Sequence, residues 1–508
     1  MKPSVRVRFA PSPTGALHIG GIRTALYNYL FAKQQNGQFL LRIEDTDQTR
    51  FVEGAEKYII DSLTWLGLIP DEGQSFGGEF GPYRQSERTD IYKRYAEELV
   101  SKGYAYYAFD TSEALEQLRN KNSGPSNQTT KYDYSSRMSM QNSLTISAAE
   151  TKKLIEDKHP YTIRIKVPES QEIKFNDTIR DEVRFRSEEL DDKVLIKSDG
   201  LPTYHLANVI DDRLMKITHV IRGEEWLSST AHHVLLYRFF GWEEEMPIFS
   251  HLPLILKPNG HGKLSKRDGA QFGFPVFPME WLSEDGTAIA GFKEFGFLPN
   301  ALLNFLALLG WHPETDQEIL SLEEMVQQFS LNKIVKSGAR FDYDKAKWFN
   351  QQYILQSSAD EIKNEIEKEF YKHEINLEKV ETEALYEMYK ERVHLISDFY
   401  RMGKYLVMEI DFFDPDFPIK KWKKDWTSAY EKLKDQFENL SVFSKDELEQ
   451  IIMEFMKLNQ FKMGEVLPTL RYMISGMTTG PDIYKMLDSL GQDKVVQRIQ
   501  NSLNSLRS

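Results

Sequence analysis

The sequence contains no cysteine among its 508 residues. This absence excludes disulfide bonds, zinc sites built on thiolates and catalytic cysteine nucleophiles. A chain of this length has room for about three to four domains. The share of hydrophobic residues, 41%, and of charged residues, 28%, is typical of a soluble globular protein.

The sequence also lacks an uninterrupted apolar run long enough to span a bilayer. Residues 1–4 lead straight into a strand pattern, without the apolar core of a signal peptide. The formal net charge of −13 argues against a protein that coats nucleic acid through a generally basic surface, although it allows local basic surfaces. We therefore expect a cytoplasmic protein with no membrane segment.

The most informative stretch is the loop Pro11–Gly21, of sequence PSPTGALHIGG. Residues 5–9 before it alternate apolar and polar side chains, which predicts a strand, and apolar residues after it recur at helical spacing up to Gly37. The first turn of this helix carries His18 and two glycines, so free N–H groups and the helix dipole favour a bound phosphate there. Ordinary loop chemistry explains the same residues, and neither common glycine-rich phosphate motif is present, so this segment alone leaves both interpretations open.

A second strand signal, at residues 39–43, ends in the acidic run Glu44–Asp47. Residues 1–108 thus alternate strands and helices, which predicts a parallel α/β sheet. Ligands of such sheets lie beyond the carboxyl ends of the strands, where both Arg8 and Glu44 fall. Taken alone, the acidic run is better explained as a solvated turn or a helix cap.

The pattern changes between residues 109 and 193. A polar loop at 120–127 precedes alternating strand signals at 162–167 and 183–186, which predict antiparallel strands in a domain inserted into the α/β core. The α/β pattern returns at residue 194. Farther along, His232 and His233 lack a third ligand at a useful spacing, so helix packing explains them better than a metal site.

Two later segments are candidates for the same site as His18. Tyr204 and Asn208 lie four residues apart and share a face if a helix has begun there. A strand signal at 251–256 leads to the run KLSKR at 263–267, whose three cations can close over a triphosphate and neutralise charge in a transition state. Considered singly, Tyr204 and Asn208 have structural explanations, and KLSKR is explained as a solvated basic loop.

Helical patterns replace strand signals from about residue 320 to the end. Lysine and aromatic side chains interleave at 420–426, and a similar patch occupies 461–472. Such patches can hold a nucleic-acid backbone and stack bases, but a lysine-rich helical surface explains each of them about equally well.

Two of these segments, at 18–21 and 263–267, are more informative together than either is alone. HIGG at 18–21 and KLSKR at 263–267 resemble the two signatures of class I aminoacyl-tRNA synthetases. RFAPSPTG at 8–15, RIEDTD at 42–47, GPYRQSER at 81–88 and YHLAN at 204–208 make the chain similar to bacterial-type glutamyl-tRNA synthetases over nearly its whole length. Gly21 and Arg267 depart from the general class pattern in ways that resemble the glutamyl branch.

The resemblance implies an α/β fold: a Rossmann-like parallel-sheet catalytic domain, an inserted α+β domain and an all-α C-terminal half that binds the anticodon. The implied boundaries are 1–108 and 194–260 for the catalytic domain, 109–193 for an inserted domain that binds the acceptor stem, 261–345 for a helical stem-contact domain with the KLSKR loop, and 346–508 for the helical anticodon-binding part.

The implied activity is that of a glutamate–tRNA ligase. Glutamate attacks the α-phosphate of Mg-ATP to give glutamyl-adenylate and pyrophosphate, and the 2′-hydroxyl of the terminal adenosine of tRNA(Glu) then takes the glutamyl group. The alternatives are a form that also charges tRNA(Gln) and a glutaminyl-tRNA synthetase. Helical signals from about residue 350 favour the glutamyl branch, since the glutaminyl enzymes read the anticodon with β-barrels. The resemblance also implies that tRNA must be bound before the adenylate forms. It further implies that the protein is a monomer.

The resemblance also assigns residues. The catalytic set is His18, Lys263 and Lys266; the ATP site is His18, Gly20, Glu225, Trp226, Lys263 and Lys266; the glutamate site is Arg8, Ala10, Ser12, Glu44, Tyr204, Asn208 and Arg222. Arg8 is expected to hold the γ-carboxylate bidentately, and Glu44 and Tyr204 to accept the α-amino group. ATP and Mg²⁺ are the expected cofactors, and no zinc or other protein-bound metal is expected, because residues 104–107 lack the Cys and His ligands of some relatives.

Overall fold

The structure is a computed structural model that describes residues 4–120, 130–283, 285–417 and 422–507. It divides into two compact units. The first comprises Met1–Glu294 and Leu302–Tyr343, and the second comprises Phe295–Ala301 and Asp344–Ser508.

A mainly parallel sheet forms the centre of the first unit, as the alternation of strands and helices predicts. One half contains β1 (Arg6–Phe9), β2 (Gln38–Leu41) and β3 (Glu72–Gly73), and the other contains β9 (His219–Gly223), β10 (Ile248–Leu252), β6 (Glu172–Asp177) and the antiparallel edge strand β7 (Asp181–Arg186). The two halves meet where the Thr218 amide donates to the Arg6 carbonyl oxygen at 2.9 Å. From this junction, β2 and β3 follow β1 on one side, and β10, β6 and β7 follow β9 on the other. Ligands of doubly wound sheets bind where the strand order reverses in this way, beyond the carboxyl ends of the strands.

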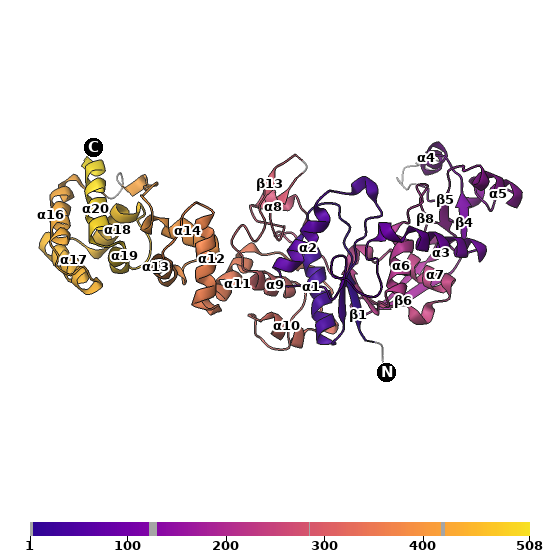
Figure 1. Ribbon diagram of the computed structural model, residues 1–508, viewed down its shortest axis with the longest axis horizontal. Helices are drawn as coiled ribbons and strands as arrows, with labels where there is room; N and C mark the ends of the chain where they lie inside the picture. The colour runs from indigo at the N-terminus through magenta and orange to yellow at the C-terminus, as the bar shows by residue number, and fades with distance from the viewer. Residues whose placement is uncertain (1–3, 121–129, 284, 418–421, 508) are drawn as a thin grey trace. The chain divides into compact units, whose positions relative to one another are not determined.

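Helices lie on both sides of β1 (Figure 1). On one side are α1 (Ile19–Gln34) and α2 (Ala55–Trp65), and on the other are α6 (Tyr204–Leu214) and α7 (Thr230–Phe240), with α3 (Thr89–Ser101) packed against α6. The apolar residues of α1 that recur at helical spacing, Ile22 and Leu26 among them, are fully buried. The predicted strand–loop–helix order of the N-terminal segment is therefore confirmed.

The segment 109–193 shares its strands with the rest of the unit. β5 (Thr162–Ile165) pairs antiparallel with β4 (Ala105–Ala108) and β8 (Val194–Ile196), while the β6–β7 hairpin extends the main sheet beside β10. α4 (Ser112–Asn120) and α5 (Ala148–Glu156) lie with the small sheet at one end of the unit (Figure 1). The polar loop predicted at 120–127 lies outside the described residues after Asn120.

The strand predicted at 251–256 is wrong as a single element. β10 ends at Leu252, and a separate short strand, β11 (Ile255–Leu256), pairs with β14 (Ala339–Arg340). Pro253 separates them because it has no N–H group for a ladder hydrogen bond. The remaining elements of this region are α8 (Asp268–Phe272), β12 (Trp281–Leu282), β13 (Ala288–Ile289), α9 (Pro299–Ala307), which crosses the boundary of the two units, and α10 (Leu322–Gln328).

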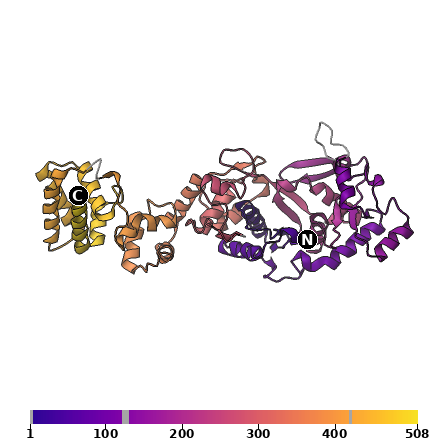
Figure 2. The same ribbon diagram turned by 90° about the horizontal axis from the view of Figure 1, so that it is seen from above.

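The second unit is helical throughout its described residues, as the sequence predicts. Figure 2 shows the helices near the C-terminus, coloured yellow, lying side by side. The helices of the unit are α11 (Tyr343–Gln356), α12 (Ala359–Tyr371), α13 (Lys379–Tyr389), α14 (Ile396–Gly403), α16 (Thr427–Glu438), α17 (Lys445–Asn459), α18 (Met463–Ser475), α19 (Ile483–Leu490) and α20 (Gln492–Arg507).

The patch at 420–426 is only partly described, because residues 418–421 lie outside the described residues. Trp426 is 4% exposed, and its ring centroid lies 5.1 Å from that of Phe461. This tryptophan therefore belongs to the helical core, and the structural interpretation of its part of the patch is the better one. Over the described ranges, no helix is both long and apolar enough to cross a membrane.

Candidate active site

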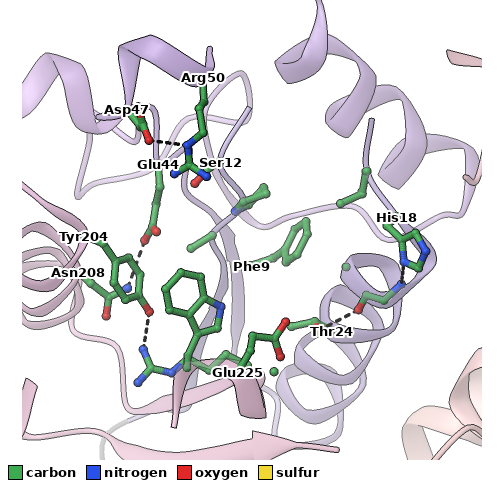
Figure 3. Close-up of a pocket in the computed structure, with 18 of the residues that line it drawn as sticks. Phe9, Ser12, His18, Thr24, Glu44, Asp47, Arg50, Tyr204, Asn208 and Glu225 are labelled. Carbon is green, nitrogen blue, oxygen red and sulfur yellow. Dashed lines mark hydrogen bonds and ion pairs between the residues drawn. The ribbon is translucent and has the colours of Figure 1, made fainter. Parts of the chain in front are cut away.

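A cavity of about 980 Å³ opens in the first unit at the carboxyl ends of β1 and β9. The structure brings all of the predicted site residues to its walls. They are Arg8, Ala10, Ser12, His18, Gly20, Glu44, Tyr204, Asn208, Arg222, Glu225, Trp226, Lys263 and Lys266. Figure 3 shows Glu44, Tyr204 and Asn208 gathered on one side and His18 on the other.

His18 caps the first turn of α1. Its Nδ1 accepts a hydrogen bond from the Gly20 amide at 3.1 Å, so the proton of the neutral ring lies on Nε2. Burial, together with the charges of Lys266 and Lys263, lowers the pKa of His18 to about 4. The Nε2 atom is buried and finds no hydrogen-bond partner among the residues that the structure describes. His18 thus offers the cavity an unused N–H donor at neutral pH.

The two lysines of KLSKR differ in their surroundings. Lys263 Nζ lies 2.7 Å from Glu225 Oε1, so its charge is paired. Lys266 has no carboxylate partner within the described part of the chain, and burial lowers its pKa. Its Nζ would lie 3.3 Å from a Cβ atom at Gly15, which has a φ of +118°. The Lys266 ammonium group therefore lies against the N-terminal loop, as a shared phosphate site requires.

We expect the wild-type protein to lose stability relative to a His18→Asn variant as the pH falls from 7 towards 4. The unfolded imidazole binds its proton near pH 6.5, whereas the folded one does so at about pH 4. The unfolded state consequently binds more protons in this window and is favoured as the pH falls. Asparagine can still cap the helix without titrating. Urea unfolding midpoints at pH 7 and pH 5 measure the effect, and a constant difference between the two proteins would contradict it.

A buried network of ion pairs includes two residues of the cavity wall, Arg8 and Glu44. Arg8 donates to Asp212 through Nε at 3.0 Å and Nη2 at 3.2 Å. Arg42 donates to Asp212 at 2.7 Å and to Glu44 at 2.9 Å. Burial raises the pKa of Glu44, although the charges of Arg42 and Arg8 act to lower it. Burial also acts to raise the pKa of Asp212, but there the charges of Arg8 and Arg42 outweigh it, and the pKa is lowered. Arg8 was predicted to hold the substrate carboxylate with two hydrogen bonds. In the structure it makes these two hydrogen bonds to Asp212.

Arg222 is held by neutral groups. It donates through Nη1 to the Tyr204 hydroxyl at 2.6 Å, through Nη2 to Thr230 Oγ1 at 2.7 Å and through Nε to His251 Nε2 at 3.1 Å. The residue is 5% exposed, and no carboxylate lies within 4 Å of its guanidinium group in the described ranges. Burial lowers its pKa. A buried cation without an anionic partner favours the binding of an anion at this place.

Four buried residues that bond to the cavity lining were missed by the assignment from sequence: Arg42, Asp212, Thr230 and His251. Arg42 stands in a stretch that the sequence analysis examined and Asp212 lies just beyond another, but nothing in a linear pattern pairs residues so far apart. His251 lies near the carboxyl end of β10, but the strand predicted at 251–256 places it at the amino end, so the strand-end rule could not find it from the sequence. As for metals, the described residues contain no group of three or more His, Asp or Glu side chains that could hold an ion.

Comparisons with known proteins extend these observations to the whole chain. Residues 4–348 match the family of "tRNA synthetases class I (E and Q), catalytic domain", and residues 345–503 match "Anticodon binding domain". The chain is 47% identical to a glutamate--tRNA ligase of Amoebophilus asiaticus over 504 residues, 99% of this chain and 98% of that protein. It is 48% identical to one of Flavobacterium johnsoniae over 510 residues, 100% of each.

A solved structure is similar over the same extent. It is a glutamate tRNA ligase from Elizabethkingia meningosepticum in complex with its amino acid, with a TM-score of 0.92, 45% identity, and coverage of 99% of this chain and 100% of that one. These matches confirm the Rossmann-like catalytic fold and the helical C-terminal part that the signatures imply. The chain belongs to the glutamate–tRNA ligases, a family of class I aminoacyl-tRNA synthetases.

Proposed function

We propose that this protein activates L-glutamate with ATP and transfers it to the 3′-terminal adenosine of tRNA(Glu), with both steps taking place in the cavity described above. The observation that carries the proposal is the state of Arg222, a buried cation whose partners are all neutral. The γ-carboxylate of glutamate would supply the missing negative charge. The amide of glutamine would leave that charge uncompensated, which favours glutamate as the substrate.

The opposite side of the cavity suits ATP. His18 would donate its Nε2–H to a phosphate oxygen, and Lys266 would neutralise charge that develops on the phosphates in the transition state. Gly20 gives the phosphates access to the start of α1, while Lys263, Glu225 and Trp226 would seat the nucleotide. None of these residues needs to act as a general base, because positioning and charge stabilisation can supply the catalysis.

The acidic and amide groups across the cavity suit the amino acid. Glu44 accepts a hydrogen bond from Asn208 Nδ2 at 3.2 Å, and a substrate ammonium group could share its carboxylate. Tyr204 and Arg8 would complete the pocket with Ser12 and the Ala10 backbone. Mg²⁺ would arrive with the ATP phosphates and add positive charge there.

Aminoacylation assays test the proposal. With ATP and tRNA(Glu), we expect the protein to charge glutamate and not glutamine, and we expect ATP–pyrophosphate exchange to depend on added tRNA. Charging of glutamine in preference to glutamate would overturn the assignment. A parallel assay with tRNA(Gln) distinguishes a strictly discriminating enzyme from one that glutamylates both tRNAs.

The rest of the chain would bind the tRNA. We propose that residues 109–193 contact the acceptor stem, that residues 261–345 form a stem-contact domain, and that residues 346–508 read the anticodon. The match of residues 345–503 to anticodon-binding domains supports the last assignment. We further propose that the protein acts as a monomer in the cytoplasm. The absence of cysteine supports the location.

A further inference from the structure

Three neighbouring strands carry a row of buried polar side chains that leads away from the cavity. Arg222 on β9 stands opposite His251 on β10 in the strand register. Asp177 is the last residue of β6, which pairs with β10 on its other side. Their exposed fractions are 5%, 0% and 4%, so water does not stand in for any of their mutual contacts.

The hydrogen bonds of this row determine the tautomer of His251. An arginine side chain has donors and no acceptor, so the bond of 3.1 Å from Arg222 Nε requires a lone pair on His251 Nε2. The ring proton then lies on Nδ1, which donates to Asp177 Oδ2 at 2.6 Å. Asp177 is in turn fixed by the Ile179 and Arg180 amides, each 2.9 Å from its Oδ1. The carboxylate thus holds the imidazole in the one neutral form that accepts from Arg222.

The same bonds limit which donors of Arg222 remain available. Nε is used by His251, and one N–H of each terminal nitrogen is used by the Tyr204 hydroxyl and by Thr230. The second N–H of Nη1 is directed at His233 Nδ1, at 3.5 Å, so only one N–H, on Nη2, is left without a partner among the described residues. If His251 instead carried its proton on Nε2, that proton could be donated to Thr230 Oγ1, 3.1 Å away, but the bond from Arg222 Nε would be lost.

We propose that Asp177 and His251 are positioning residues that set the selectivity for the substrate's acidic side chain, by holding Arg222 in the cavity wall with its remaining Nη2–H available to the ligand. This inference rests on the proposed role of Arg222 in binding glutamate. It assigns a function in amino-acid selection to Asp177, which lies within the segment predicted as a tRNA-binding insertion.

Glutamylation of tRNA(Glu) by full-length variants tests the proposal. His251→Leu removes the acceptor, and we expect it to raise the KM for glutamate about tenfold or more with the KM for ATP unchanged. His251→Gln places an amide oxygen near the position of Nε2, and we expect a glutamate KM within about threefold of wild type. Asp177→Asn can turn an amide N–H towards the ring and favour the wrong tautomer, so we expect a rise of about tenfold in the wild-type background.

The decisive comparison is Asp177→Asn combined with His251→Gln. Because glutamine has no tautomer to be set, the Asp177 substitution should add less than about twofold in that background. An equal effect of Asp177→Asn in both backgrounds, or a wild-type glutamate KM in His251→Leu, would overturn the proposal. If His251→Leu does not fold, the double-variant comparison still decides.

Arg222→Gln, measured in the same assay, separates this inference from the proposed function. A raised glutamate KM in Arg222→Gln with no effect of the His251 and Asp177 variants would remove only the positioning role. An unchanged KM in Arg222→Gln would remove the assigned role of Arg222 itself.

Discussion

Replacing Lys266 with alanine is expected to slow glutamyl-adenylate formation by about 10²- to 10³-fold while leaving the fold intact. The Lys266 ammonium group lies against the loop that carries Gly15 and has no carboxylate partner in the described part of the chain, so its charge is available to the triphosphate. Its removal takes away positive charge where negative charge grows in the transition state. Single-turnover adenylate formation with saturating tRNA, ATP and glutamate measures the effect.

A matched control is Lys93→Ala, which removes an exposed lysine of α3 that does not line the cavity and lies outside the segments proposed to contact tRNA. We expect this variant to keep the wild-type rate, which separates a local effect from a general change in charge. A Lys266→Ala enzyme that forms adenylate within threefold of the wild-type rate would show that the lysine does not stabilise the transition state.

Replacing Asp212 with alanine is expected to destabilise the catalytic unit by about 3–5 kcal/mol. The carboxylate lies 3.0 Å from Arg8 and 2.7 Å from Arg42 and is 2% exposed. Its loss leaves Arg8 with no carboxylate within 4 Å among the described residues. Arg42 keeps Glu44 at 2.9 Å, and Asp211 lies 3.9 Å from its Nε and bonds to other groups. Urea unfolding, followed by amide hydrogen exchange in β1 and α6, measures the loss.

The control for Asp212 is Asp61→Ala, which breaks an exposed ion pair with Lys57 on α2. Such a pair between helix neighbours stabilises by only about 0.3–0.5 kcal/mol. If both aspartate variants unfold at the same urea concentration, the buried network does not contribute as proposed.

Local patterns were sufficient for much of the fold. The apolar spacing after residue 18 predicts α1, and the alternation at residues 5–9 predicts β1, because helix and strand periods are properties of a short stretch. The strand predicted at 251–256 failed at Pro253, whose missing N–H interrupts a ladder that hydrophobicity alone would continue. The strands predicted at 162–167 and 183–186 are present as β5 and β7, but they lie in different sheets. β6, which pairs with β7 and joins it to β10, was missed, because its place follows from packing between distant segments.

The order of the motifs determined by itself which family the chain belongs to and which of its residues are candidates for the site, because motifs are properties of local stretches. Only the tertiary structure decided how their charges are paired. Asp212 accepts both hydrogen bonds of the bidentate pair from Arg8. Arg222 has no carboxylate partner among the described residues; it bonds to His251, which in turn bonds to Asp177. Electrostatic interactions depend on distance and burial, and residues that are far apart in the chain acquire both only when the sheet assembles.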